Sequence, residues 1–422
     1  MGGNLTLLTD QMMASLAIAI VSGIIAVKLS QKIKVPDTVL FILIGVVVGP
    51  ALLGVVNLQQ FRAGAQFILT FGAAYILYDG GREIHLKVLN QVKISVALLA
   101  TLGVIISALV TRYFSQLFLH LDFLSALLLG TVIASTDPSV LVPLFKKMSI
   151  SPKLKQTIIS ESAFNDAAAA IMTFALMGII GGGSFSLAQG VFELVKTAAG
   201  GIAVGALVGY LSLLLVSEHT LGFLDGHNAE IALAAVAGAY FIAGDLGFSG
   251  FMAVFTVGII HGNGSLFKLS IDGDAQAEHV SFKDILVRIL RIMIFIILGT
   301  QVNFGVLFES GWGVLLVVLL FIFVARPLTV LSTVLWDRKA RWKAREVLYL
   351  MWTRETGVIP AALAGTLISE RMPRAEVISA VTFTAIFLTL ILQATSAQFV
   401  ARLLHLEERK DGCGDAGIHR SN

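Results

Sequence analysis

The stretch that decides the fold reads Thr157-Ile-Ile-Ser-Glu-Ser-Ala-Phe-Asn-Asp-Ala-Ala-Ala-Ala170, and apolar residues continue beyond it. Such a segment can cross a bilayer as a helix of about 20 residues. It nevertheless contains Glu161 and Asp166. Helical spacing places Ser162 over Asp166 and Glu161 over Asn165 on adjoining faces. A carboxylate at membrane depth costs on the order of several kcal/mol unless it is paired, hydrated or neutralised. This stretch is therefore the first candidate for a functional site.

The composition supports a membrane protein. Hydrophobic residues make up 56% of the 422 residues and charged residues only 14%. A soluble domain could not bury that much apolar surface, so we predict an all-α polytopic membrane protein whose partner is the lipid bilayer. The single cysteine, Cys413, lies in a polar tail, which argues against disulfides and cysteine metal sites. Nothing in the sequence suggests nucleic-acid binding.

We predict about thirteen transmembrane helices joined by short loops. The N-terminus lacks the pattern of a cleaved signal peptide, so we expect the first apolar segment to remain as a span. The predicted spans are residues 11–30, 36–56, 63–79, 92–116, 122–145, 154–180, 188–216, 229–244, 249–263, 281–300, 311–335, 345–369 and 376–404.

Lysine and arginine gather on one side of these spans. That side carries Lys28, Lys32, Lys34, Arg82, Lys87, Lys93, Lys146, Lys147, Lys153, Lys155, Lys268, Lys283, Arg338, Lys339, Arg341, Lys343, Arg345, Arg402, Arg409 and Lys410. The other side carries Arg62, Arg112, Arg371 and Arg374. The positive-inside rule then predicts a cytoplasmic C-terminus and, with an odd number of spans, an external N-terminus in the cell membrane.

Two spans are interrupted at related places. Ser135-Thr-Asp-Pro138 lies within the fifth span, and Pro138 cannot donate to the carbonyl of Ala134. Thr353-Arg-Glu-Thr-Gly357 precedes Pro360 in the twelfth span. Spans 1–6 and 8–13 then form two six-helix halves, each with a broken fifth helix. Paired interruptions of this kind indicate a transporter built from inverted repeats, with its site near the bilayer midplane.

The two interruptions and the stretch from Thr157 to Ala170 together suggest a cation site. Asp137 and Asp166, with Thr136, Ser162 and freed carbonyls, would form an oxygen-lined site that suits a small, hard cation. Ends of half-helices also attract ions. The alternative is structural, in which Thr136-Asp-Pro138 caps a helix and Asp166 is a buried acid.

Other membrane-embedded charges have more than one interpretation. Glu161 could bind the ion, but Arg326 in the eleventh span is a natural buried partner, and we favour a structural ion pair. Asp79, at the end of the third span, is either functional or an ordinary boundary aspartate. Arg354 and Glu355 could act at the second break or could form an internal salt bridge.

An intramembrane protease is the rival from a different class. Tyr78-Asp79 with Ala243-Gly-Asp245 partly matches presenilin-type aspartyl proteases, but Ile242 stands where their first glycine is expected. Gly247-Phe-Ser-Gly250 matches a rhomboid serine motif without a histidine on a suitable partner span. We expect Ser249 to cap the ninth span instead.

Ser135-Thr-Asp-Pro138, Glu161-Ser-Ala-Phe-Asn-Asp166 and Ala325-Arg-Pro-Leu328 together resemble the motifs of the sodium/proton exchanger family. They are most similar to those of its bacterial and archaeal NhaP-like cation/proton antiporters with an Asn-Asp pair. The resemblance implies a homodimer with a scaffold domain (1–90 and 217–305) and a mobile core (91–182 and 306–406). Residues 183–216 would be a linker helix and 407–422 a cytoplasmic tail.

The resemblance also implies roles for individual residues. It makes Asp166 the carrier of the monovalent cation and the proton, with Asp137, Thr136 and Ser162 as further ligands. Asn165 would hold the broken-helix ends. Asp79 falls where some members have an acid at the ion site, and Glu161 with Arg326 resembles the family's buried ion pair. One position departs from the family pattern: Thr356 precedes Gly357 where relatives often have arginine, so no role is transferred to Arg354.

The expected function is therefore transport, not enzymatic catalysis, and no cofactor is implied. We predict exchange of a monovalent cation, Na+ first, for H+ by alternating access of the core, with K+/H+ exchange as the alternative. Asn165 is neutral where electrogenic relatives have a second aspartate, which predicts one-for-one, electroneutral exchange.

Overall fold

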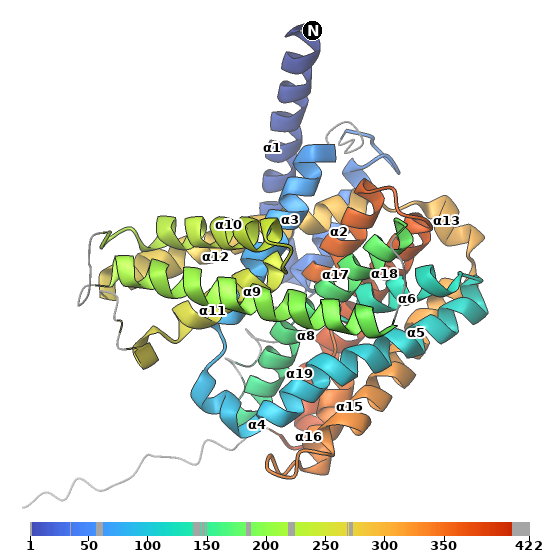
Figure 1. Cartoon of the computed structure of the whole chain (residues 1–422). Coiled ribbons are helices and arrows are strands. Elements are labelled where there is room, and N and C mark those ends of the chain that lie inside the picture. The colour runs from blue at the N-terminus through green and yellow to red at the C-terminus, as the bar shows by residue number, and fades with distance from the viewer. Residues whose placement is uncertain are drawn as a thin grey trace, which may run out of the picture.

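The computed structural model describes residues 2–33, 35–55, 62–137, 145, 148, 150–182, 187–217, 224–267, 269 and 273–406, and over these ranges it contains helices and no strand (Figure 1). The helices before the second half are α1 (Gly2–Ile33), α2 (Asp37–Val48), α3 (Arg62–Arg82), α4 (Leu86–Leu98), η2 (Leu99–Gly103), α5 (Val104–Leu119), α6 (Phe123–Ala134), α8 (Pro152–Ile180) and α9 (Leu187–Val216). Those that follow are α10 (Asn228–Asp245), α11 (Gly250–Gly262), η3 (Gly264–Phe267), α12 (Gly273–Thr300), α13 (Phe304–Glu309), α14 (Trp312–Leu320), η4 (Phe321–Ala325), α15 (Arg326–Val334), α16 (Ala344–Trp352), α17 (Val358–Ser369), α18 (Ala375–Thr389), η5 (Leu390–Ala394) and α19 (Thr395–Leu403).

The predicted spans correspond to these helices, and both predicted interruptions are present. Helix α6 ends at Ala134 and is followed by non-helical residues 135–137; Pro138 itself lies outside the described residues. The twelfth span is divided into α16 and α17 by residues 353–357. Pro360 is the third residue of α17. The first residues of a helix have no intrahelical acceptor for their N–H, so a proline there removes no backbone hydrogen bond. This proline therefore lies inside the second half-helix and does not itself interrupt the helix.

By length and composition, six helices within the described ranges can cross a membrane. They are Met12–Ile33, Leu86–Leu119, Pro152–Ile180, Val195–Val216, Trp312–Val334 and Ala375–Leu403. Shorter apolar helices include α6 and α17, the half-helices next to the two breaks. Three long spans each contain one π-helical turn and continue as α-helix beyond it: η2 lies between α4 and α5, η4 between α14 and α15, and η5 between α18 and α19.

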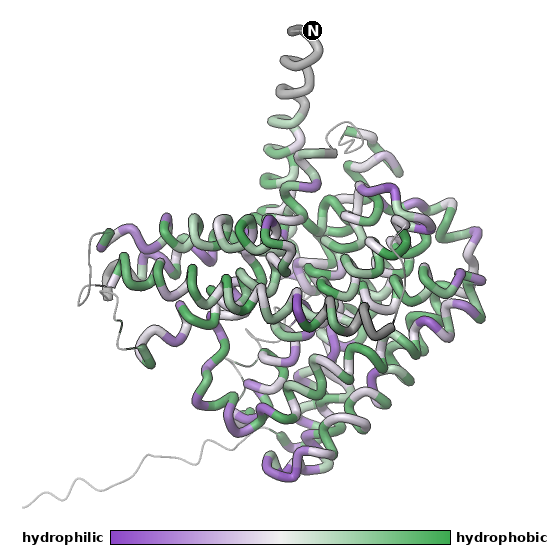
Figure 2. The backbone as a smooth tube through the Cα atoms, viewed as in Figure 1, coloured by the Kyte–Doolittle hydropathy of each residue, from purple (hydrophilic) through white to green (hydrophobic). Residues whose placement is uncertain are grey.

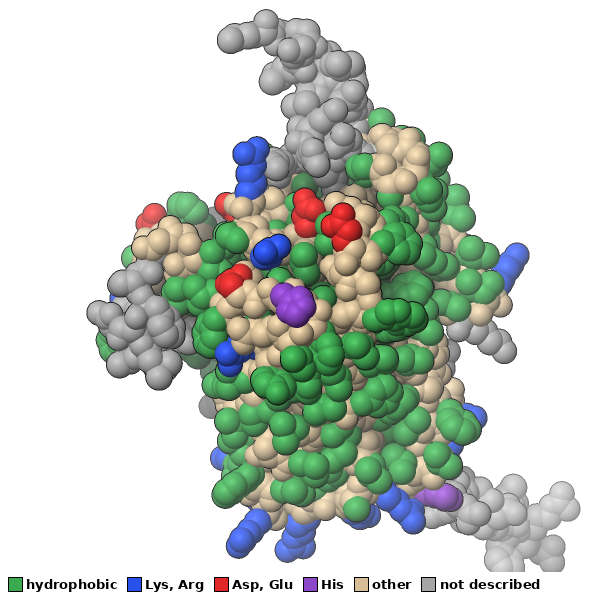
Figure 3. Space-filling view, turned by 90° about the vertical axis from the view of Figure 1, so that its right-hand side faces the viewer, with side chains coloured by type: hydrophobic (Ala, Val, Ile, Leu, Met, Phe, Trp, Pro, Cys, Tyr) green, Lys and Arg blue, Asp and Glu red, His purple; other side chains and the backbone are tan. Residues whose placement is uncertain are grey.

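The surface is that of a protein embedded in lipid. Figure 2 shows apolar residues along most of the helices and polar residues at their connections. Figure 3 shows a broad hydrophobic surface across the middle of one face, with Lys and Arg along its lower end and with Asp and Glu, beside further Lys and Arg, nearer the top. Trp312 and Trp336 stand at the two ends of the α14–α15 span and are 78% and 75% exposed. Tryptophans in such positions are typical of the two membrane interfaces.

Close backbone contacts at glycines join pairs of helices. A Cβ atom on Gly258 of α11 would lie 2.1 Å from the carbonyl oxygen of Tyr78 in α3, and one on Gly45 of α2 would lie 2.3 Å from that of Ile296 in α12. Small residues permit this packing where lipid removes the hydrophobic driving force between helices. In this way α11 packs closely on α3, and α2 packs closely on α12.

Candidate cation site

The two interrupted segments bind each other. The backbone N–H of Asp137 donates to the carbonyl oxygen of Glu355 at 2.8 Å, and the N–H of Val358 donates to Oδ2 of Asp137 at 3.1 Å. Val358 is the first residue of α17. The Asp137 carboxylate therefore caps the positive end of a half-helix, where a negative charge is favourable. Asp137 is held in place by these contacts.

Gly357 makes this contact possible. A Cβ atom at this position would lie 2.1 Å from both Cβ and Oδ2 of Asp137. No side chain fits there unless the two segments separate. The glycine is needed because of the close approach of Asp137.

We expect Gly357→Ala to lower the exchange rate about ten- to a hundredfold, because it displaces Asp137 from the site. Gly178→Ala is the matched control: it lies in α8, and a Cβ there would meet no atom within 4 Å. Initial rates of cation-driven proton movement in proteoliposomes compare the two. Equal rates for both variants would show that the position of Asp137 is unimportant.

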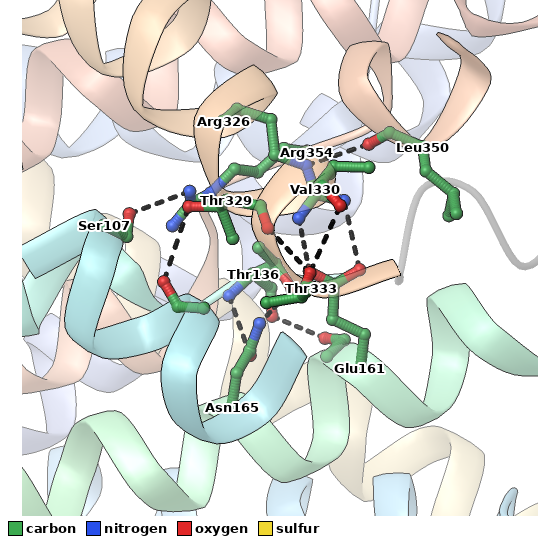
Figure 4. A network of polar contacts seen from close by, with 12 residues as sticks. Ser107, Thr136, Glu161, Asn165, Arg326, Thr329, Val330, Thr333, Leu350 and Arg354 are labelled. Atoms are coloured by element: carbon green, nitrogen blue, oxygen red, sulfur yellow. Dashed lines mark hydrogen bonds and ion pairs between the residues drawn. The ribbon is translucent and has the colours of Figure 1, made fainter. Parts of the chain in front are cut away.

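Arg354 lies at the other half-helix end. Its Nη2 donates to the carbonyl oxygen of Ala134, the last residue of α6, at 2.7 Å, and its Nη1 donates to Oγ of Ser107 at 2.9 Å (Figure 4). Its guanidinium carbon is 4.3 Å from the ring centre of Phe321. A cation is favourable at the negative C-terminal end of a helix. Asp137 and Arg354 thus place fixed opposite charges on the two half-helix ends.

The predicted alternative of an Arg354–Glu355 salt bridge is wrong. Across the described residues Arg354 forms no ion pair with Glu355, and both carboxylate oxygens of Glu355 are buried without a hydrogen-bond partner. The adjacent side chains therefore do not neutralise each other.

Helix α8 presents Asn165 and Ser162 to the first break. Asn165 accepts a hydrogen bond from the N–H of Thr136 at 3.2 Å and donates one to its hydroxyl at 2.9 Å. Ser162 donates to the carbonyl oxygen of Thr136 at 2.5 Å. One turn of α8 thus binds the backbone and side chain of a single residue, and Figure 4 shows Asn165 directed towards Thr136.

Asp166 faces the same segment. The hydroxyl of Ser135 donates to its Oδ1, and Asp166 itself is buried. The structure thus brings together Asp166, Ser162, Asn165 and Thr136 at the break that begins after Ala134. The surrounding groups are carboxylate, hydroxyl, amide and carbonyl oxygens, which suit a hard cation. Within the described ranges, no group of three or more His, Cys, Asp or Glu side chains forms a metal site.

Glu161 contacts Arg326 on the neighbouring side of α8. Both terminal guanidinium nitrogens, Nη1 and Nη2, donate to the carboxylate, and Nη2 is 3.0 Å from Oε2. Arg326 also donates to the carbonyl oxygens of Leu350 and Thr353, at 2.9 and 3.2 Å. The arginine begins α15 directly after the π-helical turn η4, a wider turn that precedes Pro327. The fully buried pair therefore joins α8, α15 and the end of α16 (Figure 4).

Asp79 lies apart from this network, in α3. Its Oδ1 is 2.5 Å from Nζ of Lys283 in α12. Asp245, its hypothetical protease partner, is exposed at the end of α10. Ser249 caps α11 as predicted, by accepting a hydrogen bond from the N–H of Met252 at 3.1 Å. The protease motifs therefore have ordinary structural explanations.

Three features of the site were not predicted from the sequence. These are the Ser135 contact with Asp166, the position of Arg354 on α6, and the steric need for Gly357. Ser135 belongs to the quoted motif, so its place at the break was a usable signal. The Arg354 contact with Ser107 joins residues 247 apart and has no local signal.

Comparisons with known proteins show which chains this one is similar to. Residues 16–403 match the family described as "Sodium/hydrogen exchanger, transmembrane". The chain is 30% identical over 415 residues to Na(+)/H(+) antiporter 1 of Methanocaldococcus jannaschii, covering 92% of this chain and 94% of that protein. It is 28% identical to the K(+)/H(+) antiporter NhaP of Alkalimonas amylolytica, covering 98% of this chain and 69% of that protein. The solved structure of the sodium proton antiporter MjNhaP1 from Methanocaldococcus jannaschii at pH 8 superposes with a TM-score of 0.84 at 29% identity, covering 94% and 99% of the two chains.

Proposed function

The chain belongs to the sodium/hydrogen exchanger family, and we propose that it is a secondary active antiporter that exchanges a monovalent cation, Na+ first, for H+. The observation that carries this proposal is Asp166: a buried carboxylate on a membrane-spanning helix whose hydrogen-bond donor is the neutral hydroxyl of Ser135. In contrast, Glu161 is neutralised by Arg326 and Asp137 caps α17. Among the acids of the first break and of α8 beside it, Asp166 is therefore the one left to take up a proton or a cation.

In the proposed cycle Asp166 binds either H+ or the cation, and never both. Thr136, Ser162 and Asp137 supply the remaining oxygens around the cation. Either occupant neutralises the carboxylate, which lowers the cost of moving it through the low-dielectric part of the membrane. Without a bound proton or cation the Asp166 carboxylate stays charged, and the site crosses the membrane less readily. This difference couples the flux of the cation to the flux of H+.

Alternating access is proposed to occur by movement of a core domain against a scaffold. Both breaks, Asp166 and the Glu161–Arg326 pair belong to residues 91–182 and 306–406, the proposed core. The scaffold would comprise residues 1–90 and 217–305, and α9 would link the two. We also propose a homodimer, with the apolar α1 residues Val21, Ile24 and Ile25, all more than half exposed, available to lipid or a second subunit.

The proposed orientation has the N-terminus outside and the C-terminus in the cytoplasm of the cell membrane. It is supported by the basic connection after α15, which includes Arg338, Lys339 and Arg341. Such a concentration of positive charge favours the cytoplasmic side.

The experiment that tests the function is cation-dependent dequenching of a pH-sensitive dye in proteoliposomes. We expect Na+ and Li+ to drive proton movement at lower concentrations than K+ and Rb+. A response led by K+ would support the second candidate, K+/H+ exchange, which the Alkalimonas amylolytica relative's name suggests. No response to any of the four cations would overturn antiport.

The transport rate should not depend on membrane potential. Asn165 is neutral and Asp137 is held by α17, so Asp166 alone exchanges one proton for one cation. A membrane potential acts on net moved charge at about 2.3 kcal/mol per charge per 100 mV, and a one-for-one cycle moves none. Potentials imposed with K+ and valinomycin during Na+ transport test this prediction. A rate that follows the potential would reject one-for-one exchange.

A further inference from the structure

Lys283 of α12 lies between two carboxylates. Its Nζ is 2.5 Å from Oδ1 of Asp79 and 3.1 Å from Oδ1 of Asp284. The two acids differ in their environment: the side chain of Asp79 is 19% exposed, whereas that of Asp284 is 59% exposed. The ammonium group therefore has an inner partner on α3 and an outer partner on its own helix.

Asp79 belongs to the part of α3 that packs against the functional stretch of α8. A Cβ on its neighbour Gly80 would be 3.5 Å from Cβ of Ala163, an ordinary van der Waals contact. Ile84, just beyond α3, also packs in one buried cluster with Ala163 and Ala167. Ala163 lies one helical turn before Asp166 and Ala167 directly follows it, so the end of α3 that carries Asp79 lies against the turn of α8 that carries the exchanging acid.

We propose that Lys283 is a tethered competitor of the transported cation. Its ammonium group is bound to Asp79, and an arriving monovalent cation replaces it there on the way to Asp166. Asp284 holds Lys283 after the replacement, so the lysine does not lose its ionic partner. Lys283 thereby sets the cation concentration at which exchange begins. This inference rests on the proposed function and adds a residue that determines apparent affinity.

Opposite effects of two neighbouring substitutions test the proposal. Lys283→Gln removes the competitor and should lower the apparent KM for Na+ about fivefold, the upper end for a partly exposed ion pair. Asp284→Asn removes the outer partner, leaves Lys283 on Asp79, and should raise the apparent KM about twofold. The double variant should behave like Lys283→Gln, because Asp284 acts only through Lys283. Lys283→Arg keeps a competing cation and should remain near the wild-type KM.

Arg291→Gln is the matched control in the same helix. Nη2 of Arg291 lies 3.8 Å from Oδ1 of Asp37, and the arginine side chain is 18% exposed. This ion pair also involves α12 but does not include Asp79. We expect its apparent KM to stay at the wild-type value. Exchange is measured in proteoliposomes, and monodisperse elution verifies folding. If Lys283→Gln does not fold, Asp284→Asn and Lys283→Arg still decide the question.

The proposal is overturned if Lys283→Gln leaves the KM unchanged or raises it, if Asp284→Asn lowers it, or if the double variant differs from Lys283→Gln. These outcomes leave wild-type antiport intact. Absence of cation-driven proton movement in the wild type would instead refute the proposed function. The two failures are therefore distinguishable.

Discussion

Replacing Asp166 with Asn is expected to reduce cation-driven proton movement to the background of empty liposomes. The amide keeps the size of the side chain and can still contact Ser135, but it cannot carry a negative charge or exchange a proton. The site then lacks the one carboxylate that exchanges its proton in the proposed cycle, while Asp137 stays bound to the N-terminal end of α17. Dye dequenching after addition of Na+ measures the loss.

Glu355→Gln is the control for this variant. Glu355 is a second buried acid at the crossing, and unlike Asp166 its carboxylate oxygens have no hydrogen-bond partner within the described chain. Its replacement by a neutral amide should preserve Na+-driven exchange within about twofold, since its backbone carbonyl still accepts from Asp137. Exchange that survives in Asp166→Asn but disappears in Glu355→Gln would transfer the coupling role to Glu355. Both proteins should elute as folded species.

The second large effect concerns stability. Removing one member of the Glu161–Arg326 pair leaves a buried charge without compensation, which costs about 3–5 kcal/mol in soluble proteins. Glu161→Gln and Arg326→Gln should therefore lower the melting temperature strongly. Arg326→Gln should have the larger effect, because it also removes the hydrogen bonds to Leu350 and Thr353.

Lys153→Gln is the comparison for these stability variants. Nζ of Lys153 lies 2.7 Å from Oε2 of Glu346, but the lysine side chain is 21% exposed. Partly exposed ion pairs contribute at most about 1 kcal/mol to the free energy of unfolding. Thermal unfolding in detergent followed by intrinsic fluorescence ranks the variants. A stable Glu161→Gln with an altered apparent KM for Na+ would make Glu161 a ligand of the cation.

The fold could be predicted from the sequence because hydrophobic length and helix-breaking residues are local signals. The predicted interruptions at residues 135–138 and 353–357 are the best example, although the second half-helix begins before Pro360 and includes it. Acids within apolar spans were also visible as candidates, since lipid makes unpaired charges costly.

Partners across the crossing could not be predicted in the same way. Arg354 binds the end of α6, and Asp79 binds a lysine 204 residues away. These contacts depend on how the half-helices pass one another and on which side chain reaches which helix end. Hydrophobic pattern and residue spacing contain no information about either.

In the proposed antiporter one carboxylate, that of Asp166, binds either a proton or a cation. The most direct test measures isotopic Na+ uptake into proteoliposomes over a series of Na+ concentrations and external pH values. At pH values where Asp166 is mostly protonated, competition at one site predicts that the apparent KM for Na+ rises about tenfold for each unit of pH decrease, while the maximal rate at saturating Na+ is unchanged. An apparent KM that does not depend on pH would mean that protons and cations bind at separate sites, and exchange at a single carboxylate would be wrong.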